Sequence, residues 1–276
     1  MISQADAMID LELDKLGYTF LTIDDRWHLP DRDNVTGRMV EDPDKFPNGI
    51  KYISDYLHSK GLKIGIYSSA GLYTCSGFLP GSLGHEKTDV AMMVDYEIDY
   101  FKYDNCYPRL DGTSNIGEGG VNINFTASAE HYPSLWQDPD EESRYAPMAE
   151  ELALVKGIRN ITFELCAWGF GNVETFGPRF GHVWRTSADI TDTWEGLLWN
   201  IDVNDEVRYR QEGVQGPSTG GWNYPDGLYI GKGGMSDTEY RTMFALWCLV
   251  KSPLMLGTDL RDLTRDREAY KTIMNQ

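Results

Sequence analysis

Four acidic motifs in the sequence each stand at the end of an apolar, strand-like run. In an α/β barrel the carboxyl ends of the parallel strands meet at one face, and that face carries the active site. We therefore expect the acidic side chains to surround a single pocket. The motifs contain Asp24 and Asp25, Lys102 and Asp104, Arg185 and Asp189, and Asp226.

This combination of side chains indicates the chemistry of the ligand. Several carboxylates with one lysine and one arginine suit a neutral polyhydroxylated molecule, whose hydroxyl groups both donate and accept hydrogen bonds. A sugar fits that description. Two of the acids, held on opposite sides of an anomeric carbon, could serve as the nucleophile and the general acid/base of a glycosidase.

Each motif also has a simpler interpretation. An Asp at a strand end often caps the following helix, and Lys102 could be half of an ion pair. Asp24 and Asp25 with His28 could suggest a metal site, but no second histidine stands at ligand spacing, so we expect no metal. The chain lacks G-x-S-x-G and its glycines lack the phosphate-cradling spacing, which argues against a serine hydrolase and a nucleotide. We expect no cofactor.

Composition excludes two classes of partner. The 276 residues contain 25 Lys+Arg and 43 Asp+Glu, for a formal charge of −18, so electrostatic binding of nucleic acid or of an anionic membrane surface is not expected. The longest apolar run, residues 244–250, is far shorter than the roughly 20 residues that span a bilayer. The hydrophobic fraction of 41% is enough for one large core.

Strand-like and helix-like segments alternate along the chain. A first helix is expected to end at Gly17, and further helices are centred on residues 50–57, 90–94, 148–155 and 194–207. Ser236 and Glu239 form a capping-box pattern that opens another helix. Strands are expected at residues 18–23, 62–67, 99–103, 161–165, 183–186 and 254–256, with a further one ending near residue 223.

This alternation predicts an α/β fold, specifically a (β/α)8 TIM barrel with helices outside a parallel sheet. Seven strands are expected, and because the chain opens on a helix the first strand of the barrel is expected to be absent. Residues 1–276 are interpreted as a single domain. Residues 107–142 are predicted to form a large loop on the carboxyl face of the barrel.

Two cysteines and three sequons bear on where the protein works. Cys75 and Cys106 each follow a strand-like run, which would bring them close together in a sheet and is compatible with one disulfide bridge. Sequons at Asn34, Asn124 and Asn160 are compatible with a secreted glycoprotein. The first residues do not form a signal peptide.

The motifs in their order along the chain resemble glycoside hydrolase family 27, which contains the α-galactosidases (melibiases) and the α-N-acetylgalactosaminidases. The resemblance extends through nearly the whole chain and is strongest to fungal and other eukaryotic secreted members. The runs that carry it are LGYTFLTIDD at 16–25, KFPNG at 45–49, GIYSSAG at 65–71, TC at 74–75, PGSLG at 80–84, YFKYDNC at 100–106, WR at 184–185 with Asp189, GGWN at 220–223 and KSPL at 251–254.

The resemblance implies a retaining mechanism on a (β/α)8 barrel, with Asp104 as nucleophile and Asp189 as acid/base. It implies a disulfide between Cys75 and Cys106, and it places a terminal α-galactoside as the substrate. Cations near Asp104 are expected to lower its pKa, whereas an acid in a less charged setting can keep its proton near neutral pH. The implied substrate-binding residues are Asp24, Asp25, Tyr67, Lys102, Cys106, Ala167, Trp168, Arg185 and Asp226.

The chain departs from the family pattern at several positions. The family's first strand, with a Gly-Trp-Asn-Ser-Trp type motif, has no counterpart before Met1, and no C-terminal β-sandwich is expected within residues 1–276. Arg26 stands where many members have cysteine, and Tyr224 stands where Asp is usual. Ala167 occupies a position where α-galactosidases often carry a carboxylate or amide, which leaves space for a 2-acetamido group.

Three hypotheses follow for the function. The first is a retaining exo-acting α-galactosidase, secreted by resemblance to its family, whose oligomeric state the sequence does not indicate. The second is a non-catalytic, truncated remnant, because loss of a barrel strand would leave two sheet edges unpaired. The third keeps the chemistry and changes the sugar to N-acetylgalactosamine or β-L-arabinopyranose.

Overall fold

In the part of the chain that the structure describes, six parallel strands form one sheet and follow one another in sequence order. The computed structural model describes residues 1–107, 140–210 and 220–275. Neighbours in the sheet are neighbours in the chain, so β1 forms one edge and β6 the other. The strands are β1 (Phe20–Thr22), β2 (Lys63–Ser69), β3 (Tyr100–Asp104), β4 (Thr162–Cys166), β5 (Val183–Arg185) and β6 (Trp222–Tyr224).

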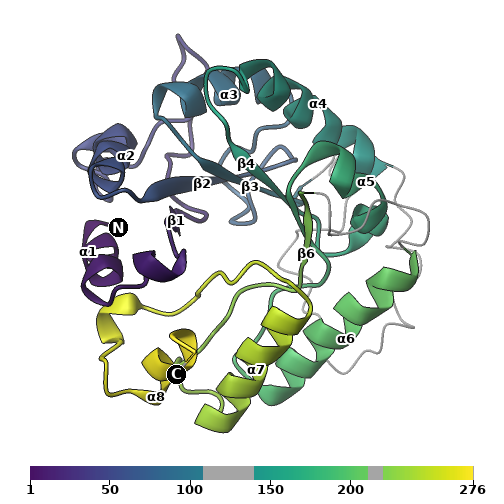
Figure 1. Ribbon diagram of the computed structural model, residues 1–276. Coiled ribbons are helices and arrows are strands. Elements are labelled where there is room, and N and C mark those ends of the chain that lie inside the picture. Colours follow the sequence, from purple (N-terminus) through teal and green to yellow (C-terminus); the bar gives the residue numbers. More distant parts are fainter. Residues whose placement is uncertain (108–139, 211–219, 276) are drawn as a thin grey trace.

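Eight α-helices lie around the outside of this sheet and follow the strands in order around it, which gives the described residues the form of a half-barrel (Figure 1). The connection from each strand to the next is a crossover, as parallel pairing requires. The helices are α1 (Ile2–Asp10), α2 (Gly49–Ser59), α3 (Glu86–Asp95), α4 (Asp140–Val155), α5 (Val173–Phe180), α6 (Trp194–Arg210), α7 (Asp237–Leu249) and α8 (Glu268–Ile273).

The apolar periodicity of the helices explains how they pack. In α2, Ile50, Ile53 and Leu57 share one face and are all buried against the sheet. Gly61 follows with a φ of +76°, a conformation that glycine adopts without strain, and the chain turns into β2. In α7, the capping box of Ser236 and Glu239 is confirmed, since the two residues satisfy each other's backbone N–H groups.

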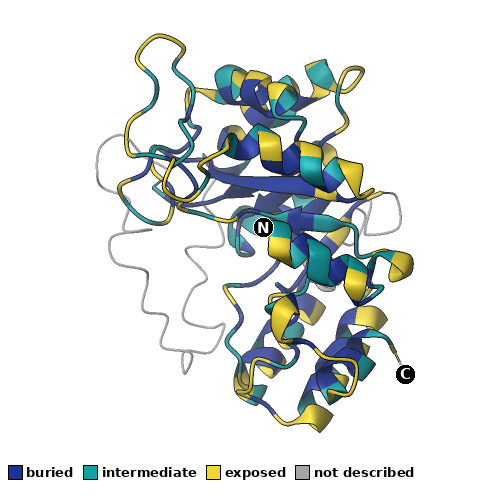
Figure 2. Cartoon of the chain, turned by 90° about the vertical axis from the view of Figure 1, so that its left-hand side faces the viewer, coloured by how far each residue is buried: buried dark blue, intermediate teal, exposed yellow. Residues whose placement is uncertain are grey.

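The core lies between the outer face of the sheet and the helices. Phe101, Tyr103 and Phe163 point into it from β3 and β4, and the rings of Phe101 and Phe163 are stacked with centroids 5.9 Å apart. Trp184 of β5 is fully buried in the same layer. Figure 2 shows the middle of the sheet mostly in the colour of buried residues, and most exposed residues lie on the outer helix faces and in the loops.

Several predicted elements differ from the structure. The sheet of the described residues has six strands where seven were predicted, because residues 254–256 contribute only an isolated parallel bridge between Leu228 and Leu256. The first helix ends at Asp10, and a short 3-10 turn, Asp14–Leu16, precedes Gly17. Helices α5 and α8 were not predicted, since Gly177 and Pro178 interrupt the first pattern and the second is only six residues long.

The two ends of the described chain pack against each other. The side chain of Gln4 in α1 donates to Asp259 at 2.7 Å and accepts from the backbone N–H of Leu260 at 3.0 Å. Residues near the carboxyl end are thereby held beside α1 and the β1 edge of the sheet (Figure 1). Within the three described ranges, no helix has the length and apolar character needed to cross a bilayer.

Candidate active site

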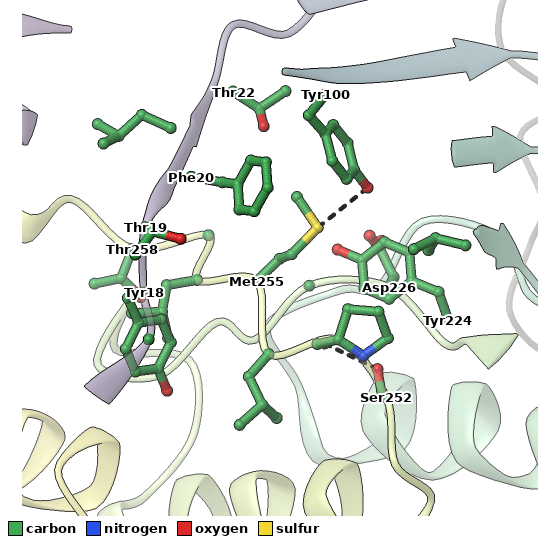
Figure 3. A pocket seen from close by; sticks show the side chains of 18 of the residues that line it. Tyr18, Thr19, Phe20, Thr22, Tyr100, Tyr224, Asp226, Ser252, Met255 and Thr258 are labelled. Atoms are coloured by element: carbon green, nitrogen blue, oxygen red, sulfur yellow. Dashed lines mark hydrogen bonds between the residues drawn. The ribbon is translucent and has the colours of Figure 1, made fainter. Parts of the chain in front are cut away.

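A cavity of about 1210 Å³ lies on the inner face of the half-barrel. Strands β1, β3, β4, β5 and β6 supply one part of its wall, and the extended residues 251–258 supply another. Figure 3 shows Tyr100, Tyr224 and Met255 projecting into this space. Five of the predicted site residues line it, namely Asp24, Lys102, Arg185, Asp189 and Asp226.

The sheet register places these side chains side by side. Tyr67 of β2 is paired with Lys102 of β3, and Lys102 in turn with Glu164 of β4. Two residues further along, Asp104 is paired with Cys166. Because residues two apart on a strand share a face, Lys102 and Asp104 both project from the inner face of β3.

Asp104 is buried, with a relative exposure of 5%. The Tyr67 hydroxyl donates to its Oδ2 at 2.9 Å, and the backbone N–H of Asn105 donates to its Oδ1 at 2.9 Å. Burial raises the pKa of Asp104 to about 6, even though the Lys102 cation and these two hydrogen bonds act in the opposite direction. The carboxyl is therefore ionised only above mildly acidic pH.

Lys102 connects two of the predicted carboxylates. Its Nζ lies 2.8 Å from Asp24 Oδ2 and 5.4 Å from the centroid of the Tyr67 ring. The charge of Lys102 acts on both Asp104 and Asp189, since it opposes the rise in the pKa of the first and lowers the pKa of the second. Lys102 thus pairs directly with Asp24 and acts electrostatically on Asp104 and Asp189.

Asp25 has a different position from its neighbour. Its Oδ2 accepts from the backbone N–H of Ser76 at 2.9 Å, and its Oδ1 accepts from the backbone N–H of Arg26. Asp25 does not line the cavity. In the ligand-free chain its carboxylate therefore fastens the loop that carries Cys75.

On the opposite side of the site, Arg185 forms ion pairs with Asp189 and Asp226. The guanidinium is 1% exposed, and it lies 3.0 Å from Asp189 Oδ1 and 3.2 Å from Asp226 Oδ1. The second oxygen of Asp226 accepts from the backbone N–H of Ile190 at 2.8 Å. Asp189 itself is 82% exposed, and the adjacent Arg185 cation lowers its pKa below the ordinary 3.8.

The expectation for the two pKa values is therefore wrong in both directions. Lys102 was expected to lower the pKa of Asp104, but the loss of hydration around this buried carboxyl is the larger effect. Asp189 was expected to keep its proton, but it is the acid that pairs directly with a buried arginine. Both cations, Lys102 and Arg185, can be recognised in the sequence, but the sequence does not show which of the two carboxyls is buried.

The predicted disulfide between Cys75 and Cys106 is confirmed, with α-carbons 5.1 Å apart. Backbone segments approach closely around it, since a Cβ on Gly71 would lie 1.8 Å from the carbonyl oxygen of Cys106. Only glycine fits at that position. The other two cysteines of the chain, Cys166 and Cys248, are unpaired.

The remaining predicted residues lie outside the cavity. Ala167 is completely buried, so the ligand-free structure does not open a space at its Cβ. Trp168 has a φ of +55°, and its ring packs edge-on to Phe170 with centroids 5.9 Å apart. Cys106 is 3% exposed and takes part in the disulfide.

Potential metal ligands gather at one place in the described ranges. Cys75, Asp104 and Cys106 offer atoms within 4.8 Å of one another. The two sulfur atoms are bonded to each other, so neither is a thiolate that could ligate a cation. This cluster does not fit a metal centre.

Glu164 is a site residue that the sequence analysis missed. It lines the cavity from β4 and is 1% exposed. Its only sequence signal is an acidic residue in the middle of a strand that is otherwise apolar or small. Strand alternation showed that Glu164 and Phe163 face opposite ways, but not which of them faced the cavity.

A family model described as "Alpha galactosidase A" matches residues 1–137 and 142–275. The chain belongs to the melibiase family, glycoside hydrolase family 27. The resemblance read from the motifs is thereby confirmed.

Relatives with curated names support the same assignment. An α-galactosidase of Oryza sativa is 40% identical over 261 residues, which are 95% of this chain and 54% of the relative. α-Galactosidase 2 of Arabidopsis thaliana is 39% identical over 99% of this chain and 59% of its own length. The chain thus spans a little over half the length of these two relatives.

Solved structures share the fold. The α-galactosidase of Saccharomyces cerevisiae superimposes with a TM-score of 0.79 at 28% identity, over 99% of this chain and 57% of that chain. α-Galactosidase I of Mortierella vinacea gives a TM-score of 0.78 at 30% identity, over 99% and 65%. The strands and helices described above are therefore those of the family.

Proposed function

We propose that this chain carries the catalytic site of a retaining exo-α-galactosidase, with Asp104 as nucleophile and Asp189 as acid/base. The observation that carries this proposal is a pair of carboxyls that end β3 and follow β5: Asp189 lines the cavity, and Asp104 lies buried two residues beyond Lys102 on the same face of β3. Asp189 is close enough for its charge to raise the pKa of Asp104. The names of the curated relatives support α-galactose as the sugar.

In the first step, a carboxylate oxygen of Asp104 bonds to the anomeric carbon while Asp189 gives its proton to the departing glycosidic oxygen. In the second, Asp189 accepts a proton from water, and that water oxygen displaces Asp104 from the anomeric carbon. Two inversions at one carbon return the sugar with its original α configuration.

Above about pH 6 the site favours only half of the protonation state that the reaction requires, the ionised form of Asp104. The reaction needs Asp104 ionised and Asp189 protonated, yet burial raises the pKa of Asp104 to about 6 and Arg185 lowers the pKa of Asp189. Only a minor fraction of the free site is therefore in the reactive state. Substrate binding over the exposed Asp189 would remove water from it and raise its pKa toward the value that an acid catalyst needs.

Sugar recognition is assigned to the side chains around these two acids. Asp24 and Lys102 would hold the outer hydroxyls, Arg185 and Asp226 would line the far wall, and Tyr67 would keep Asp104 in place. A second group of residues is proposed to approach the sugar after it binds, namely Asp25, Cys106, Ala167 and Trp168. The half-barrel is proposed to be part of a (β/α)8 barrel, with residues 1–276 forming one catalytic domain.

The disulfide supports a location in an oxidising compartment, and we infer that the protein is secreted. Two sequon residues, Asn34 and Asn160, are exposed and would be available for glycosylation. The third, Asn124, lies outside the described residues.

The test is hydrolysis of p-nitrophenyl α-galactoside, with ¹H NMR used to identify the anomer of galactose that forms first. We expect turnover with α-galactose as the first product, and an Asp104→Asn variant is the matched inactive control. A panel with α-N-acetylgalactosaminide and β-L-arabinopyranoside determines the preferred sugar. β-Galactose as first product would refute the retaining mechanism, and no turnover of any glycoside would favour a non-catalytic remnant.

A further inference from the structure

Two backbone hydrogen bonds hold Asp104 at the end of β3. The N–H of Asn105 donates to Asp104 Oδ1 at 2.9 Å, so the place of this peptide unit fixes one oxygen of the proposed nucleophile. The N–H of Ala70, directly after β2, donates to the backbone carbonyl oxygen of Asp104 at 2.7 Å. Side chains that fix Asn105 and Ala70 therefore also fix the carboxyl of Asp104.

Two charged side chains near the start of α4 reach these two residues. Glu141 Oε1 accepts from the side-chain Nδ2 of Asn105 at 2.7 Å, and Arg144 Nη1 donates to the backbone carbonyl oxygen of Ala70 at 3.1 Å. The two charged side chains also form an ion pair, with Arg144 Nη2 lying 3.3 Å from Glu141 Oε1. Helix α4 lies on the outside of the sheet between α3 and α5 (Figure 1), so this pair connects the helix layer to the strand end that carries Asp104.

The side chains of this network are withdrawn from water. Asn105 and Glu141 are completely buried, and Arg144 is 7% exposed. Desolvation of a buried ion pair roughly cancels the attraction between its charges, so two well-packed apolar side chains would stabilise the fold about as well. Apolar side chains could not accept from Asn105 or donate to Ala70. The charged pair therefore adds a defined position for the end of β3, more than it adds stability.

Glu141 also has a simpler interpretation. An acidic side chain near the amino end of a helix interacts favourably with the helix dipole. The neighbouring Glu142 can serve that purpose, because it is 46% exposed and pairs with Arg179 of α5. The dipole requires neither the burial of Glu141 nor its hydrogen bond to Asn105, and both features favour a role at the active site.

We propose that Glu141, held in place by Arg144, is a positioning residue of the active site. It acts through Asn105 and keeps the carboxyl of Asp104 at the place from which it bonds to the anomeric carbon, since an error of about 1 Å in such a position can slow a reaction about 100-fold. Neither Glu141 nor Arg144 lines the cavity, so the effect falls on turnover and not on sugar binding. The inference rests on the proposed role of Asp104 as nucleophile.

The experiment compares two substitutions of Glu141 in the full chain. Glu141→Ala removes the acceptor for Asn105, whereas Glu141→Gln keeps an acceptor oxygen at the same place. Steady-state kinetics on p-nitrophenyl α-galactoside are measured at a temperature well below the Tm of each variant. We expect kcat to fall about 10- to 100-fold in the Ala variant with KM within about twofold of wild type, and to stay within about threefold of wild type in the Gln variant. Wild-type kcat in a folded Ala variant, or an equal loss in both variants, would overturn the proposal.

Two variants outside the network serve as controls. Glu142→Ala removes an acidic side chain from the same part of α4 and thereby tests the helix dipole. Asp99→Asn weakens the amino end of β3, where the Asp99 carboxylate accepts from the backbone N–H of Ile64 at 3.0 Å and pairs with Arg159, and thereby tests a general loss of stability. We expect wild-type kcat in both variants. A fall in kcat as large as that of Glu141→Ala in either control would refute a specific role of Glu141.

A double-mutant cycle tests whether Glu141 acts through Asn105. Asn105→Ala alone should lower kcat by about the same factor as Glu141→Ala, and the double variant should lose less than about threefold more. Multiplicative losses would refute the route through Asn105. If Glu141→Ala does not fold, Asn105→Ala decides the proposal, because wild-type kcat in that variant would overturn it.

Amide hydrogen exchange followed by NMR provides a readout that needs no substrate. The Asn105 N–H is protected while its hydrogen bond to Asp104 Oδ1 is closed, so Glu141→Ala should speed its exchange by about tenfold or more, with the amides of β4 as the unchanged reference. Faster exchange in a chain that hydrolyses no glycoside would refute the proposed function alone. Unchanged exchange in a chain that hydrolyses the galactoside would refute the role of Glu141 alone.

Discussion

The two carboxyls proposed as catalytic occupy opposite kinds of environment within one site. Asp104 is enclosed by β2, β3 and the Cys75–Cys106 bridge, with a relative exposure of 5%. Asp189 stands on the loop after β5 and is 82% exposed, although the guanidinium beside it is completely enclosed. Lys102 acts on both acids and Arg185 acts on Asp189, and yet the pKa values of the two acids move in opposite directions.

This difference shows that burial, more than the presence of a cation, decides the charge state of these acids. At Asp104 the lost hydration outweighs the attraction of Lys102. At Asp189 the direct contact with Arg185 outweighs the smaller loss of hydration. Substitutions that alter the environment of one acid and leave that of the other unchanged can therefore test this difference.

The largest expected effect distinguishes the role of Asp104, the proposed nucleophile, from that of Asp189, the proposed acid/base. Asp104→Asn should reduce kcat for every glycoside by on the order of 10⁴-fold or more, because no group remains to bond to the anomeric carbon. Asp189→Asn should cost about 10²- to 10⁴-fold, and less for p-nitrophenolate, a leaving group that needs little protonation. Steady-state kinetics on p-nitrophenyl and natural galactosides measure both losses. Equal losses on the two substrates would contradict the acid role of Asp189.

The next largest effect is on the free energy of unfolding and concerns only the buried surroundings of Asp104. Replacing both Cys75 and Cys106 by alanine should lower the free energy of unfolding by about 2 to 4 kcal/mol, because the bridge closes a loop over a sequence separation of 31 residues. Urea denaturation measures the change. Cys248→Ser removes an exposed free thiol and should alter stability by less than about 0.5 kcal/mol. Similar losses in the two variants would show that the bridge does not stabilise the Asp104 side.

The third effect concerns pH and stability. The pKa of Asp104 in the folded chain, about 6, lies above its ordinary 3.8, so the folded state binds the proton more tightly and stability falls as pH rises between these values. Asp104→Asn removes this decline and should gain up to about 3 kcal/mol relative to wild type between pH 4 and pH 7. Urea unfolding at several pH values provides the measurement.

The same measurement on Asp189→Asn should give the opposite pH dependence of stability. Since Arg185 lowers the pKa of Asp189, its contribution to stability is present above pH 3.8 and is lost as pH falls through its lower folded value. The Asn variant should therefore lose stability relative to wild type as pH rises through this range, the reverse of Asp104→Asn. Parallel pH profiles for the two variants would show that the two environments do not differ.

The smallest expected effect is on sugar preference. Ala167→Glu should raise the ratio of kcat/KM for α-galactoside over α-N-acetylgalactosaminide by about tenfold, because the closed surroundings of Ala167 cannot hold the longer side chain, which would extend toward the bound sugar and obstruct a 2-acetamido group. Ala167→Ser adds little volume and serves as the control. An unchanged ratio in the Glu variant would assign sugar preference to other walls of the pocket.

Much of the fold could be predicted from the sequence. Apolar runs located β1 to β5, and the helix signals located α2, α3, α6 and α7, because periodicity and capping are local properties of the chain. The extended residues 254–256 had the composition of a strand but form only one bridge to Leu228. Pairing depends on what lies beside a segment, which local composition does not contain.

The site was predicted less completely. Strand ends identified Asp24, Lys102, Asp104, Arg185 and Asp189, because catalytic side chains gather there in parallel sheets. The direction of each pKa shift depends on burial and contact distances, which arise only when the strands are assembled. Glu164 was missed for the same reason, since its importance comes from the register that places it beside Lys102.

The position of the Cys75–Cys106 bridge also determines how it exchanges with external thiols. Cys75 is exposed while Cys106 is 3% exposed, so an attacking thiolate reaches the sulfur of Cys75 and expels that of Cys106. Asp104 Oδ2 lies 3.2 Å from the sulfur under attack, and its charge would repel an approaching anion above pH 6. The expelled thiolate would also form in buried surroundings, where it is a poor leaving group. A closed bridge therefore persists through exposure to mild reductants.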